Sequence, residues 1–121
     1  MKLHEHIDAR MNLVMRHGDG IVRINGRDLS APCMVAPGFL QTEWIDSLDS
    51  LSAESLAQLW PSEPRVLLLG TATPQHPRIR ELRPLAAARQ VALEVMDLGA
   101  ACRTYNVLAQ EDRPVAALLF P

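Results

Sequence analysis

The chain has 121 residues, of which 48% are hydrophobic and 21% are charged, and its formal net charge at pH 7 is −2. This length and balance predict one globular domain over residues 1–121 and exclude a largely disordered chain. The acidic balance and an aromatic content of only 4% argue against a nucleic-acid binder, and no apolar run is long enough to span a membrane as a helix.

The N-terminus gives little sign of targeting or of a metal site. Residues 1–6 become charged early and lack the apolar centre of a signal peptide, and Glu5 and Asp8 disfavour a mitochondrial transit peptide. We therefore expect a cytoplasmic location. His4 and His6 have no third ligand at a fixed spacing, so no metal site is predicted, and no cofactor motif is present.

The first third of the chain has the pattern of β-structure. Residues 20–27 predict a strand that ends in Asn25-Gly26, a strong hairpin signal, and the return strand is expected over residues 28–35 with Pro32 at an edge or bulge. Pro37-Gly38 predicts a turn before a further short strand over residues 39–44.

From residue 52 onward, helices and strands alternate. Ser52 predicts the N-cap of a first helix that ends at Pro61, and residues 65–70 predict a strand buried on both faces. Residues 77–89 predict a helix that Pro84 interrupts, either as its end or as the start of a second segment.

The last part of the chain repeats the alternation. A strand over residues 91–96, a helix from Asp97 to about Ala109 and a final strand over residues 115–120 are expected. Alternating strands and helices favour right-handed crossovers around a parallel sheet, so we predict an α/β fold whose parallel core the N-terminal hairpin extends or covers.

Three segments in this order carry a resemblance to a known family. They are the strand and turn of residues 65–73, the strand and helix of residues 93–108, which include Thr104-Tyr105-Asn106, and the closing strand of residues 111–121. The chain resembles the DUF498 or Mth938-like family, whose eukaryotic branch includes an assembly factor for respiratory complex I. The resemblance implies a three-layer α/β domain with a mixed central sheet, a parallel core, flanking helices and an N-terminal β-hairpin layer.

The candidate pocket lies where two expected parallel strands end. Gly70, Thr71 and Thr73 follow the first strand, and Asp97 and Gly99 follow the second, at the start of a helix. Open α/β sheets bind ligands at the carboxyl ends of their strands, and a helix N-terminus offers free N–H groups. A structural turn and an N-cap carboxylate explain the same residues, and both interpretations remain open.

Cys102 and Tyr105 complete the candidate pocket, one helical turn apart. A thiol near a helix N-terminus can be reactive, but a free cysteine among apolar residues is commonly a buried core residue. The spacing of Cys33 and Cys102 indicates neither a disulfide framework nor a metal site.

A basic cluster surrounds the second expected helix. It comprises His76, Arg78, Arg80, Arg83 and Arg89. The cluster could attract an acidic partner or a phosphate, or it could be an ordinary solvated helix face.

Two classes of function follow. The first is a non-enzymatic binding or assembly module with a protein partner, in keeping with the lack of a recognisable nucleophile–base pair. The alternative is a small-molecule or anion-binding protein, or an enzyme, with its pocket between the Gly70–Thr73 turn and the helix that starts near Leu98. We expect no nucleic acid and no membrane as a partner, and the sequence leaves the oligomeric state open.

Overall fold

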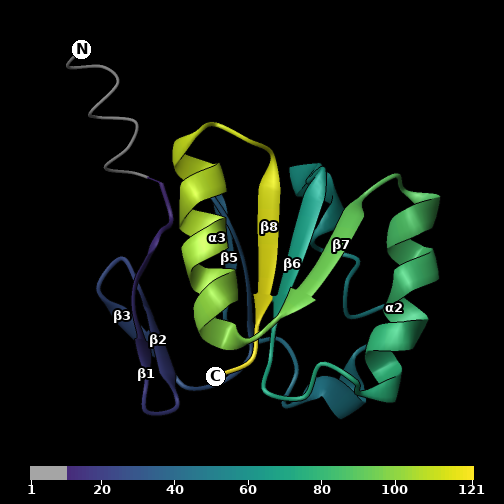
Figure 1. The fold of residues 1–121 in the computed structure, drawn as a ribbon, viewed down its shortest axis with the longest axis horizontal. Helices are drawn as coiled ribbons and strands as arrows, with labels where there is room; N and C mark the ends of the chain where they lie inside the picture. Colours follow the sequence, from purple (N-terminus) through teal and green to yellow (C-terminus); the bar gives the residue numbers. More distant parts are fainter. Residues whose placement is uncertain (1–10) are drawn as a thin grey trace.

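The computed structural model describes residues 11–121, which form two sheets, two α-helices and two short 3₁₀ segments (Figure 1). The strands and helices have the following bounds: β1 Val14–Gly18, β2 Ile21–Ile24, β3 Arg27–Leu29, β4 Cys33–Ala36, β5 Phe39–Gln41, η1 Leu48–Ser50, η2 Trp60–Ser62, β6 Val66–Gly70, α2 Pro77–Ala88, β7 Ala92–Met96, α3 Leu98–Gln110 and β8 Val115–Leu119.

The larger sheet is mixed, as the sequence predicted. Its strand order is β5-β4-β8-β6-β7, in which β6 is parallel to both β7 and β8, whereas β4 is antiparallel to β8 and β5. The chain runs from β6 through α2 to β7 on one side of β6. It then runs from β7 through α3 past β6 to β8 on the other side. Crossovers of one hand that run in opposite directions place their helices on opposite faces, as Figure 1 shows for α2 and α3.

Alternating side chains of the central strands divide the interior into two apolar clusters. Leu68 and Ala117 point to the face that α3 and the small sheet cover, whereas Leu67, Leu69 and Leu118 point to the face of α2. The continuous apolar runs in β6 and β8 therefore reflect strands covered on both faces.

The small sheet, with order β1-β2-β3, is a separate antiparallel layer that lies beside α3 (Figure 1). The hairpin at Asn25-Gly26 is confirmed, since β2 pairs with β3 across it. The expected return strand over residues 28–35 was wrong in extent, because β3 ends at Leu29 and Cys33 begins a strand of the other sheet. Pro32, which lacks a backbone N–H, lies in the connection between the two sheets.

Two helix predictions also need correction. Residues 51–62 form successive i→i+3 turns, such as Leu56 N–H to Ala53 O at 3.3 Å and Leu59 N–H to Leu56 O at 2.9 Å, and not a regular α-helix. Ser55 competes for the local backbone, because its hydroxyl donates to Ser52 O at 2.9 Å. The second helix runs unbroken through Pro84, whose ring lies on the exposed face where water can satisfy the freed carbonyl.

Candidate functional site

The crevice at the carboxyl ends of β6 and β7 is closed by helix α3. A Cβ atom built on Gly70 would lie 2.7 Å from Ala101 Cβ and 3.2 Å from Leu98 Cα, so the first turn of α3 packs directly on the end of β6. Thr71 N–H donates to Met96 O at 3.0 Å and joins the two strand ends. The glycine therefore provides close helix–sheet packing, and its backbone is not left open to a ligand.

Asp97 and Gly99 lie at the start of α3. The Asp97 carboxylate accepts a hydrogen bond from Ala100 N–H at 2.8 Å, which is the geometry of an N-cap. A Cβ on Gly99 would lie 2.9 Å from His17 Cε1 and 3.1 Å from Arg103 Nη1, so this glycine lets β1 approach the helix. Asp97 therefore caps α3, and Gly99 allows the close contact between α3 and β1.

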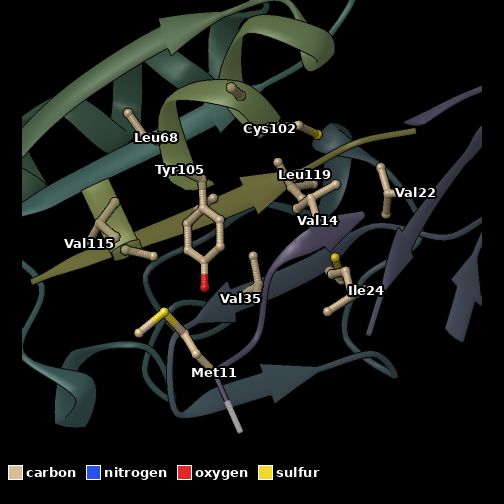
Figure 2. Close-up of a cluster of buried hydrophobic side chains, with 14 residues drawn as sticks. Met11, Val14, Val22, Ile24, Val35, Leu68, Cys102, Tyr105, Val115 and Leu119 are labelled. Atoms are coloured by element: carbon tan, nitrogen blue, oxygen red, sulfur yellow. The ribbon is translucent and has the colours of Figure 1, made fainter. Parts of the chain in front are cut away.

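Cys102 and Tyr105 lie in the apolar core between α3 and the sheets (Figure 2). Burial raises the pKa of the Cys102 thiol to about 11, and burial together with the Cys102 thiol raises the pKa of Cys33 to about 12. Both thiols are protonated at neutral pH and are poor nucleophiles. The pKa of the Tyr105 phenol is also raised, chiefly by burial.

Two residues of Thr104-Tyr105-Asn106 join α3 to Asn12 and to the start of β1, whereas the Thr104 hydroxyl donates to Met96 Sδ of β7 at 3.8 Å. Tyr105 donates its hydroxyl hydrogen to Asn12 O at 2.7 Å, and Figure 2 shows the hydroxyl at the end of the ring nearest Met11. The Asn106 amide accepts from Val14 N–H at 2.9 Å and donates to Val14 O at 2.7 Å. These bonds satisfy buried polar groups and fix the position of the small sheet on the helix.

Thr71 and Thr73 lie at a different cavity, of about 330 Å³, on the other side of the strand ends. Thr71 is 3% exposed, its Oγ1 accepts from Thr73 N–H at 3.1 Å, and the two hydroxyl oxygens are 3.2 Å apart. The cavity wall also contains Asp46, Asp49, His76 and Phe120. The candidate residues are therefore divided, because Asp97, Gly99, Cys102 and Tyr105 do not line this cavity.

An imidazole–carboxylate contact at this cavity was missed from the sequence. His76 Nδ1 accepts from Arg78 N–H at 3.1 Å and caps α2, while His76 Nε2 lies 2.9 Å from Asp49 Oδ1. Because Nδ1 accepts, Nε2 carries the hydrogen and donates to Asp49. The position of His76 just before Pro77 was a signal for the cap, but nothing in the spacing of Asp49 indicated the contact.

The remaining candidate residues fall outside this cavity or outside the described part of the chain. In the basic cluster, Arg78 pairs with Glu81 at 3.0 Å and the Arg89 guanidinium lies 4.6 Å from the Trp60 ring centroid. His4 and His6 lie outside residues 11–121. Within that range no three His, Cys, Asp or Glu side chains gather as a metal ion would require, and neither helix has the length and apolarity to span a membrane.

Comparisons of sequence and of structure with known proteins point to the same family. Residues 14–120 match the family described as "Protein of unknown function (DUF498/DUF598)". The chain is 36% identical over 100 residues to "NADH dehydrogenase [ubiquinone] 1 alpha subcomplex assembly factor 3" of Danio rerio, an alignment that covers 81% of this chain and 58% of the relative. The chain thus spans about half the length of the curated relatives it matches.

Two solved structures share the fold. An outer membrane protein from Bartonella henselae superposes with a TM-score of 0.76 at 30% identity, over 91% of this chain and 94% of that one. A Mth938-like domain from Bordetella pertussis superposes with a TM-score of 0.72 at 30% identity, over 91% of this chain and 85% of that one. The predicted Mth938-like architecture is confirmed, and the chain belongs to the DUF498/DUF598 family.

Proposed function

We propose that this chain is a non-enzymatic module that binds a protein partner and supports an assembly step. The observation that carries the proposal is the closed strand-end crevice, where Gly70 and Ala101 bring α3 into contact with β6. Enzymes and cofactor-binding proteins with α/β sheets place their ligands in such a crevice, so its closure favours a role for the outer surface.

The chemistry of the candidate residues supports the same proposal. The Cys102 thiol is buried and protonated, the Tyr105 hydroxyl is bonded to the backbone, and the Asp97 carboxylate caps α3. The thiol and the phenol are thus not available to a substrate, and the carboxylate has a structural role at the helix start. The Danio rerio relative is named as an assembly factor, and a binding role for this chain agrees with that name.

A second candidate function rests on the cavity beside Thr71 and Thr73. Its volume of about 330 Å³ suits a small ligand, and it combines hydroxyl groups with the Phe120 ring. Since Asp46 and Asp49 line the same cavity, a neutral polar ligand fits better than an anion.

A cytoplasmic location remains part of the proposal for this chain.

Purification of the protein from its own host tests the two candidates against each other. The Ala72→Trp variant places a large side chain at the wall of this cavity, at an exposed position. If the chain is a protein-binding module, wild type and Ala72→Trp should both co-elute with the same protein in size-exclusion chromatography. Recovery of a small molecule with no protein from wild type, and its absence from Ala72→Trp, would favour the cavity as a ligand site. Loss of the protein partner from Ala72→Trp would instead mean that the partner binds at the cavity.

A further inference from the structure

A groove follows helix α2 on the side that faces the 3₁₀ turns of residues 51–62. It comprises three cavities of about 240, 200 and 470 Å³. Ala53 and Leu85 line both the first and the second cavity, and Trp60 and Arg89 line both the second and the third. The three cavities therefore adjoin one another along α2, and together they are here called the α2 groove.

The apolar part of the α2 groove results from the replacement of an α-helix by 3₁₀ turns. These turns are narrower than an α-helix and fill less of the space beside α2. The exposed walls carry the small side chains of Ala53, Ala57 and Ala88, and Leu85 is half-buried between them. Apolar side chains of a partner can therefore enter the groove without displacing the core.

The other end of the α2 groove is cationic. Arg89 is the C-cap residue of α2, and its guanidinium lies 4.6 Å from the Trp60 ring centroid. Arg65 and Glu63 line the same cavity as Arg89. Among residues 11–121, neither arginine forms an ion pair. The wall of this cavity thus carries two guanidinium groups and one carboxylate, and the Trp60 indole holds the Arg89 guanidinium in place.

We propose that the α2 groove binds an extended, acidic segment of a partner protein, with apolar side chains beside α2 and carboxylates at Arg65 and Arg89. The inference rests on the proposed binding function and names its surface. A guanidinium matches a carboxylate through two parallel hydrogen bonds, and arginine and tryptophan are enriched where interfaces gain most of their affinity.

The dimensions of the groove set the size of the bound segment. From Arg78 to Arg89 the helix rises about 16 Å, which an extended peptide covers with about five residues. The expected segment therefore has two or three apolar residues next to one or two acidic residues. A polyanion such as nucleic acid fits less well, because the chain as a whole carries a net charge of −2.

Three labelled peptides of equal length test the inference. The probe is Leu-Ala-Leu-Glu-Glu, and its two controls replace both glutamates with glutamine or with lysine. We expect the acidic peptide to bind about tenfold more tightly than the glutamine peptide in fluorescence anisotropy at low salt. In NMR spectra, its shifts should centre on Ala57, Trp60 and Leu85.

Charge-reversing variants separate recognition from a loss of folding. The double variant Arg65→Glu/Arg89→Glu should reverse the preference, so that the lysine peptide binds more tightly than the acidic one. Arg80→Glu/Arg83→Glu, which reverses two exposed charges of α2 outside the groove walls, is the matched control and should keep the preference for the acidic peptide. Circular dichroism of each variant verifies the fold.

Several results would overturn the inference. They are no peptide binding at about 1 mM, equal affinity for the acidic and glutamine peptides, an unchanged preference in the double variant, or shifts confined to the Thr71 cavity. If the protein from its host retains a partner equally well with and without the double substitution, the binding function stands and the groove assignment fails. Absence of any partner contradicts the binding function itself.

Discussion

Truncation of Tyr105 should destabilise the protein strongly, because this side chain joins the core to the N-terminal segment. Tyr105 is 0% exposed and donates to Asn12 O at 2.7 Å. Tyr105→Phe removes one buried hydrogen bond and should cost about 1 kcal/mol of the free energy of unfolding. Tyr105→Ala also loses the packing of the ring and should cost about 3 kcal/mol or more.

Urea denaturation followed by tryptophan fluorescence and circular dichroism measures both effects. Both apolar clusters share the larger sheet, so we expect one transition by both probes and a similar m value in each variant. Val107→Ala, at a 52% exposed position on the same helix, is the control and should change stability by less than about 0.5 kcal/mol. A Tyr105→Ala midpoint equal to that of wild type would refute the argument that this residue holds the core together.

Three further predictions concern the packing of α3. Gly70→Ala should cost about 1–3 kcal/mol, because the new Cβ meets Ala101 Cβ at 2.7 Å, and Ala101→Gly should recover part of that loss in a double-mutant cycle. Stability should fall as pH rises from 9.0 toward 11, because the unfolded thiols ionise while Cys33 and Cys102 keep their protons in the fold. At about pH 10 the loss is about 2–3 kcal/mol, and urea titrations of the Cys33→Ala/Cys102→Ala variant should show a flatter pH dependence. Native Cys102, 1% exposed, should react with a thiol reagent far more slowly than in urea, and equal rates would contradict its burial.

The parts of the fold that depend on local sequence were predictable. The strand–helix alternation after Val66 and the cap at Asp97 follow from apolar periodicity and from the preference of aspartate for N-caps. The division of residues 28–35 between two sheets was not predictable, because it depends on which distant strand each part pairs with. Cys33 pairs with Leu119, a partner that no local pattern identifies.

The candidate site was only partly predictable for a similar reason. Gly70 and the alanines of α3 leave room either for a ligand or for a closely packed helix, and the sequence does not distinguish these. The distance from Gly70 to Ala101 shows that the helix occupies the space. The α2 groove was not predictable, because it lies between α2 and a segment that forms 3₁₀ turns where the sequence predicts a helix.

Native mass spectrometry of the protein purified from its own host tests the binding function most directly. We expect a complex whose mass equals this chain plus at least one different protein chain, which dissociates to the unmodified chain on activation. A species of this chain with only a small molecule bound, and no protein partner, would contradict the proposed binding function and favour the Thr71 cavity as the functional site.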